Sequence, residues 1–163
     1  MKAIRINAPG AGDWIMAQTG GVFRPELDHS IATFNGDEML GGFVFTQYLG
    51  NAIAVHDWGD APGWCTRDLL WMVFHYAFRQ LKCHKLIAPT PSDNRHALAL
   101  NLRAGFKLET VIRDVFRPGC HLMILTMVAT ECRWLDIVPQ RYSPGGAYYG
   151  SEHLAWKDQD DGR

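Results

Sequence analysis

The sequence lacks any long apolar run. No stretch approaches the roughly 20 residues that a membrane-spanning helix needs, and the N-terminus lacks a basic segment followed by an apolar one. Net charge is also scarce, because 16 basic and 17 acidic residues leave −1 and the basic residues are scattered. These absences argue against a membrane role and against a nucleic-acid partner, whose phosphates attract clustered basic side chains. We expect a cytoplasmic protein.

Closely spaced cysteines are missing as well. The four cysteines form no C-x-x-C pair, so reduced thiols are the simplest interpretation. Seven histidines occur, but none lies in an H-E-x-x-H motif or at zinc spacing from a cysteine. The sequence therefore predicts no metal site.

What is present fits one domain. The chain has 163 residues, of which 47% are hydrophobic and 20% charged, as in an ordinary globular protein with a full core. We assign residues 1–156 to this domain and expect the polar residues 157–163 to form a disordered end.

The first third of the chain predicts antiparallel strands. Asn35-Gly36 is a strong two-residue hairpin signal, and Gly41-Gly42 indicates a bulge or a close backbone approach. The expected elements are strands over residues 1–6, 29–34, 38–49 and 52–58 and one short helix between residues 7 and 25.

The stretch from residue 62 to residue 106 predicts helix, strand, helix and strand. Thr66 is a suitable N-cap for a helix of about four turns that begins at Arg67, because apolar residues recur on one face as far as Leu81. A short apolar strand follows over residues 85–91. It contains Pro89, which has no N–H, so the last part of this strand should lack a hydrogen-bonding neighbour on one side.

A second helix is expected between a cap at residues 92–94 and Ala104. Gly105 suits the left-handed position that closes a helix. Two more strands are expected over residues 107–116 and 121–128, joined by a turn at Pro118-Gly119, and residues 132–135 are expected to dock as a short helix.

The step Asn94-x-x-Ala97 followed by Gly105-Phe106, behind a loop, a helix and a proline-containing strand, resembles the acetyl-CoA-binding half of the GNAT superfamily of N-acetyltransferases. The resemblance covers roughly residues 30–135 and is nearest to small stand-alone members, including some carried by phages and prophages. The family's Gln/Arg-x-x-Gly-x-Gly/Ala loop is absent, and Gly59 and Gly63 stand in for its glycines. The resemblance implies an α/β (α+β) domain with a mixed, mostly antiparallel sheet whose central strands splay apart.

The resemblance also implies acetyl-CoA as the co-substrate. Free N–H groups and the dipole at a helix start suit a diphosphate, and Arg67 would add a charge-assisted contact. Asn94 would bind the pantetheine arm; in the alternative, Asn94 is only a cap and Asn101 is half exposed. Trp64 would be a wall against the cofactor or a cover over the sheet edge. The expected cofactor-binding residues are Trp58, Gly63, Trp64, Cys65, Thr66, Arg67, Asn94, Ala97 and Asn101.

Acetyl transfer needs a neutral amine. A lysine amine, with a pKa near 10.4, needs a general base, whereas an α-amino group with a pKa of about 7.7–8.0 needs little more than desolvation. The candidate catalytic residues are His56 and Asp57, whose side chains point to opposite sheet faces, so at most one serves as the base. His56 has the more suitable unperturbed pKa. In the alternative, His56 is a polar core residue and Asp57 a turn residue.

The family's frequent tyrosine acid is absent from the second helix, so protonation of the leaving thiolate would come from water or from Tyr48, Tyr142 or Tyr148. Two rival hypotheses are an inactive CoA-binding or interaction module and a hydrolase that uses Cys65, whose pKa a helix start would depress. The acceptor is expected to be a small-molecule or peptide amine. In proteins that the resemblance names, the segment between the first two strands forms a wall of the acceptor site, so the short segment 7–25 implies a site that is open or that a partner completes, such as a second copy in a homodimer.

Overall fold

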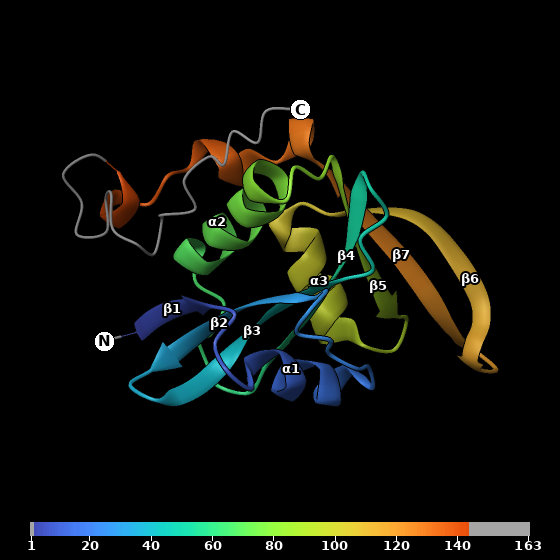
Figure 1. Ribbon diagram of the computed structural model, residues 1–163. Coiled ribbons are helices and arrows are strands. Elements are labelled where there is room, and N and C mark those ends of the chain that lie inside the picture. The colour runs from blue at the N-terminus through green and yellow to red at the C-terminus, as the bar shows by residue number, and fades with distance from the viewer. Residues whose placement is uncertain (1, 144–163) are drawn as a thin grey trace.

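A computed structural model describes residues 2–143, which form one seven-stranded sheet in the order β1-β2-β3-β4-β5-β7-β6 (Figure 1). Every neighbouring pair is antiparallel except β4 and β5, which run parallel. The strands are β1 (Lys2–Ile6), β2 (His29–Asn35), β3 (Glu38–Thr46), β4 (Ala52–Gly59), β5 (Lys85–Pro91), β6 (Lys107–Arg117) and β7 (Cys120–Val128). The predicted fold class is confirmed. Tyr148 and residues 157–163 lie outside the described residues.

Helices cover both faces of the first half of the sheet (Figure 1). α1 (Ala11–Thr19) packs on β2, β3 and β4 from one side, while α2 (Arg67–His75) lies on the other side together with α3 (Arg95–Ala104). Because side chains alternate along a strand, each face has its own apolar cluster. The cluster under α2 includes Ile31, Phe45, Ile53 and Leu86, and the cluster under α1 includes Ala32, Phe34 and Val44.

The helix that begins at Arg67 is confirmed at its start and corrected at its end. The Thr66 hydroxyl accepts a hydrogen bond from the backbone N–H of Leu69 at 3.1 Å, as an N-cap does. Residues Tyr76–Gln80 form a π-helical turn where the periodicity predicts a continuous α-helix. The Tyr76 hydroxyl lies 2.9 Å from Nδ1 of His29. Because these residues are far apart in the sequence, the spacing of apolar residues along the helix does not predict their contact.

The splaying of the two central strands is confirmed. The β4–β5 ladder joins Ala52 to Lys85, Ile53 to Leu86 and Ala54 to Ile87 and then stops, whereas β5 stays paired with β7 as far as Pro91. The backbone N–H of Lys85 donates to the carbonyl of Asn51, so the N–H groups of residues 85, 87 and 89 point toward β4. The third of these residues is Pro89, which has no N–H to donate.

The glycine pair of β3 makes the close approach that the sequence predicts. A Cβ on Gly41 would lie 2.6 Å from the Cα of Gly59, and one on Gly42 would lie 2.5 Å from the carbonyl oxygen of Ile31. β3 is shorter than the expected 38–49, because Gln47 adopts a φ of 53°, which ends a strand.

After β5, the end of α3 and the short helical turn near residue 133 lie where the sequence predicts them. Gly105 closes α3 with a φ of 110°, and the short helical turn Arg133–Asp136 docks through Trp134, whose Nε1 donates to the carbonyl of Ala104 at 2.7 Å. Within residues 2–143, no helix has the length and the apolar character to cross a membrane.

Candidate active site

A cavity of about 220 Å³ opens at the carboxyl end of β4. It therefore lies where β4 has separated from β5, between the loop before α2 and the start of α3. Its lining consists of Asp57, Trp58, Gly59, Trp64, Asn94, His96 and Ala97.

Asp57 supplies the carboxylate of the cavity lining. Its side chain is half-buried, and among residues 2–143 no hydrogen bond or ion pair holds it. Burial raises the pKa of Asp57 to about 7, because a charged carboxylate is poorly solvated there. A group with this pKa gains and loses protons near neutral pH, as acid–base catalysis requires.

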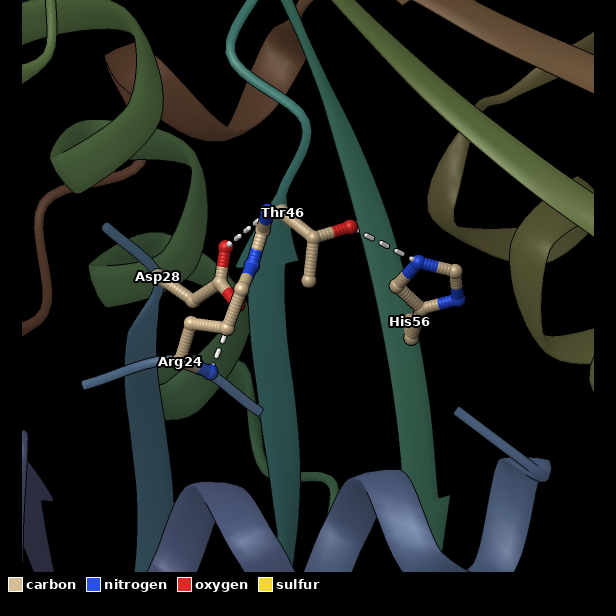
Figure 2. A network of polar contacts seen from close by, with 4 residues as sticks. All are labelled: Arg24, Asp28, Thr46 and His56. Atoms are coloured by element: carbon tan, nitrogen blue, oxygen red, sulfur yellow. Dashed lines mark hydrogen bonds and ion pairs between the residues drawn. The ribbon is translucent and has the colours of Figure 1, made fainter. Parts of the chain in front are cut away.

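His56 lies on the opposite face of β4, as the alternation of strand side chains predicts. Its Nε2 is 3.1 Å from the Oγ1 of Thr46 in β3 (Figure 2). Next to this pair, the buried Asp28 accepts hydrogen bonds from the backbone N–H and the guanidinium of Arg24. Burial lowers the pKa of His56, and the negative charge of Asp28 partly opposes this shift. His56 is therefore neutral at about pH 7.

Trp64 both lines the cavity and covers the strand backbone. Its side chain is 7% exposed, and its ring lies 5.5 Å from that of Phe43 between centroids. Trp64 therefore covers the end of β4, and its role as a wall against the cofactor stays a prediction. The neighbouring Gly63 has a φ of 72°, and its carbonyl accepts a hydrogen bond from Nζ of Lys2 at 2.8 Å.

The helix start beyond Trp64 is open to an anion. Arg67 is exposed, and no hydrogen bond or ion pair with the described residues engages its guanidinium. Asp68, which would repel an anion, is paired with Arg141 at 2.7 Å. No described residue accepts from the backbone N–H groups of Arg67 and Asp68. These are the free donors that a diphosphate uses at a helix start.

Cys65 does not have the depressed pKa that its place before a helix predicts. Burial, with a smaller contribution from the charge of Asp57, raises the pKa of the Cys65 thiol to about 12. The thiol is therefore the stable form at neutral pH, and only a thiolate is a strong nucleophile. This finding opposes the hydrolase hypothesis.

The two asparagines of the predicted site lie in different environments. Asn94 caps α3, accepting from the backbone N–H of Ala97 at 3.1 Å, while its Nδ2 donates to no residue in the range 2–143 and its side chain lines the cavity. Asn101 is 3% exposed, and its Nδ2 donates to the Oγ1 of Thr90 at 3.3 Å. The alternative of a half-exposed Asn101 is wrong, and Asn101 is not part of the cavity lining.

His96 lines the cavity, although no motif singles it out. It occupies the second residue of α3 and is exposed. One signal in the sequence could have found His96: it lies in the first turn after an asparagine cap, directly after the strand that loses its hydrogen-bonded neighbour. Of the tyrosines expected as proton donors, Tyr48 bonds to the carbonyl of Gly50 and Tyr142 stacks on Trp71, and neither lines the cavity.

Metal ligands do not gather in the part of the chain that the structure describes. Among residues 2–143, no group of three or more His, Cys, Asp or Glu side chains is placed to hold a metal ion.

Comparisons with known proteins give a clear result for the fold. No family model and no curated protein matches the sequence. Among solved structures, a Desulfovibrio desulfuricans protein named as an acetyltransferase of the GNAT family is similar over 79% of this chain and 99% of its own, with 20% identity and a TM-score of 0.63. The chain has the GNAT fold.

Two further structures with the GNAT fold are also similar. A mutant form of the Vibrio cholerae spermidine/spermine N-acetyltransferase matches over 85% of this chain and 100% of its own, with 14% identity and a TM-score of 0.64. The Bacillus anthracis acetyltransferase of the GNAT family matches over 77% of this chain and 87% of its own, with 15% identity and a TM-score of 0.55. At these identities the likeness concerns the fold, and the nearer resemblance to phage members stays a prediction.

Proposed function

We propose that the protein transfers an acetyl group from acetyl-CoA to a primary amine, by direct attack of the amine in a ternary complex. The observation that supports this most is the opening between β4 and β5 beyond the pair Ala54–Ile87, with the cavity at its end. The backbone groups of Val55 and Asp57 point into this opening, because they share their direction with those of Asn51. Their N–H groups would polarise the thioester carbonyl.

The residues of the cavity fit acetyl-CoA. The diphosphate would bind to the guanidinium of Arg67 and to the free N–H groups of Arg67 and Asp68. It would lie beside the loop residues Gly63, Cys65 and Thr66. The free Nδ2 of Asn94 would donate to an amide carbonyl of the pantetheine arm, with Ala97 and Trp64 as apolar surface. Trp58 also borders the cavity, but its side chain packs with the cluster under α1, on the face of His56. Asn101 would act indirectly, by holding α3 against β5 through Thr90.

The acceptor amine would approach from the other face of the sheet. α1 packs mainly on β2, β3 and β4 there, and the half-buried residues on the same face of β5 and β7 are Ile87, Pro89, Leu122 and Ile124. His56 belongs to this face and is suited to be the general base.

The charges around this face support an acceptor with an apolar body. The acidic residues of β5, β6 and β7 are Glu109 and Asp114. Glu109 is bonded to Lys85 at 2.7 Å and to Thr126, and Asp114 accepts from the backbone N–H of Gly119 at 2.7 Å. Both carboxylates are partly engaged within the protein, which would weaken their contact with a polycation of the kind named for the Vibrio cholerae enzyme. A homodimer would complete the open face.

Native mass spectrometry of the purified protein with acetyl-CoA, followed by a thiol-release assay with a panel of amines, tests the proposal. We expect a one-to-one complex and release of free CoA that depends on the amine. Binding without release would support the rival hypothesis of an inactive CoA-binding module. Absence of both binding and release would overturn the proposed function. The same spectra report the number of subunits.

A further inference from the structure

The proposed transfer leaves one proton without a donor. When the carbon–sulfur bond of a thioester breaks, the sulfur departs as a thiolate and is stabilised by taking up a proton. α3 carries no tyrosine, and Tyr48 and Tyr142 are not among the lining residues of the cavity. Among residues 2–143, the lining residues that can give up a proton are Asp57 and His96.

The geometry of the opening places Asp57 and His56 on either side of the same gap. Beyond Ala54 and Ile87 the strands are no longer paired, so a thioester held at the edge of β4 would lie between the two faces of the sheet. His56 is half-buried on the face of β4 that α1 packs against, beside the part of the same face that β5 and β7 form. Asp57 lies on the other face, in the cavity that also holds Asn94 and Ala97. Were the ladder continuous, the sheet would separate the two side chains.

We infer that His56 and Asp57 divide the two proton transfers, His56 taking the proton of the attacking amine and Asp57 giving a proton to the leaving sulfur of CoA. This inference rests on the proposed function and assigns an acid that the tyrosine position does not supply. Although the two residues are adjacent in sequence, one can act as the base and the other as the acid, because their side chains lie on opposite faces of the sheet.

The step balances in atoms and charge. The nitrogen lone pair forms a bond to the carbonyl carbon, the carbon–sulfur bond breaks, and the electron pair of that bond remains on sulfur. The N–H proton passes to His56, whose Nδ1 carries the lone pair when Nε2–H is donated to Thr46. The carboxyl proton of Asp57 passes to sulfur. Afterwards His56 loses its proton to water and Asp57 regains one.

The protonation states agree with this division. Desolvation raises the pKa of Asp57 to about 7, so that the protonated carboxyl is available near neutral pH. Desolvation also lowers the pKa of His56, which keeps its ring neutral and able to accept a proton. The side chain of Asp57 has no partner among residues 2–143 that would fix it in one state.

A change of leaving group tests the division. In the selenium analogue of acetyl-CoA, selenium replaces the thioester sulfur, and a selenolate leaves without a proton because selenols are much stronger acids than thiols. We expect Asp57→Asn to lower kcat about 10²-fold with acetyl-CoA and less than about tenfold with the analogue. His56→Gln should lower kcat to a similar extent with both donors. Asp60→Asn is the matched control: Asp60 is exposed, and asparagine keeps an oxygen that can accept the hydrogen bond from Nε1 of Trp58, so this variant should change neither rate.

Further measurements make the outcome decisive. An equal loss with both donors in Asp57→Asn would overturn the inference, as would a donor-dependent loss in His96→Gln. If Asp57→Asn proves unstable, the wild-type protein gives the same test, because its kcat should fall above about pH 7 with acetyl-CoA and stay level with the analogue. Failure of the wild-type protein to bind acetyl-CoA or to acetylate any amine would instead refute the proposed function.

Discussion

The indole of Trp64 lies so close to the backbone of Gly59 that a Cβ at this glycine would be 2.3 Å from the ring. The loop before α2 is therefore folded back onto the end of β4, and the aromatic ring forms part of the cavity lining. Because Gly59 has no side chain, it leaves space beside the backbone of β4, and the ring of Trp64 fills that space.

The first prediction concerns this contact. Gly59→Ala should lower the free energy of unfolding by about 1–3 kcal/mol, because the added methyl overlaps the buried ring. Denaturant titration measures the effect. In a Trp64→Leu background the same substitution should cost markedly less, since a smaller side chain can move away. Simple addition of the two single effects would contradict direct contact between the two residues.

The second prediction concerns the free energy of unfolding, which burial of the Asp57 carboxylate lowers. Its pKa rises from 3.8 in a free chain to about 7 on folding, so the folded state binds the proton more tightly and loses stability as pH increases between these values. Asp57→Asn should remove this loss, with a gain that is smallest near about pH 4 and reaches at most about 4 kcal/mol above about pH 7. Unfolding at about pH 5 and about pH 8 tests this. A gain independent of pH would refute desolvation of the Asp57 carboxylate as the cause.

The opening between the central strands was predictable because it has a local chemical cause. Pro89 removes one hydrogen-bond donor, and the direction of that donor follows from the alternation along β5. The caps at Thr66 and Asn94 and the left-handed Gly105 are local in the same way. Each depends on one side chain and the residues within a turn of it.

Other features of the site depend on residues that are distant in the chain. The pKa values of Cys65 and Asp57 are raised by burial, which the whole fold creates, and the local helix start predicts the opposite shift for Cys65. The burial of Asn101 depends on Thr90 in β5. His96 enters the cavity because of how α3 sits beside the separated strands. None of these has a signature in spacing or composition.

The third prediction separates the two roles of Asn94. Its Oδ1 caps α3 and its Nδ2 is free to bind a ligand. Asn94→Asp retains the accepting oxygen, so it should keep the stability of the protein but weaken binding of acetyl-CoA, because it loses the donor and adds a charge. Asn94→Ala should weaken binding and also cost about 0.5–2 kcal/mol of stability. Calorimetric titration and thermal unfolding measure the two effects, and unchanged affinity in Asn94→Asp would exclude Asn94 from the cofactor site.

The fourth prediction concerns Cys65. Because its pKa is raised to about 12, very little thiolate is present at neutral pH, and iodoacetamide should modify this thiol far more slowly than a free cysteine. Cys65→Ala should retain acetyl transfer, since the thiol takes no part in the proposed chemistry. Peptide mass mapping gives the modification rate. Rapid labelling of Cys65 together with loss of activity in Cys65→Ala would revive the hydrolase hypothesis.

The last prediction separates the diphosphate of acetyl-CoA from its pantetheine arm. Arg67 is exposed at the start of α2 with a free guanidinium, whereas the neighbouring Asp68 is neutralised by Arg141. Arg67→Gln should therefore raise the Kd of acetyl-CoA by roughly tenfold, the value of one charge-assisted hydrogen bond. The same substitution should leave kcat/KM unchanged with S-acetyl-pantetheine, which has no diphosphate. Arg95→Gln, an exposed arginine at the first residue of α3, is the matched control for loss of one positive charge. If Arg67→Gln and Arg95→Gln weaken acetyl-CoA binding equally, the effect is one of overall charge, and the helix start is not the diphosphate site.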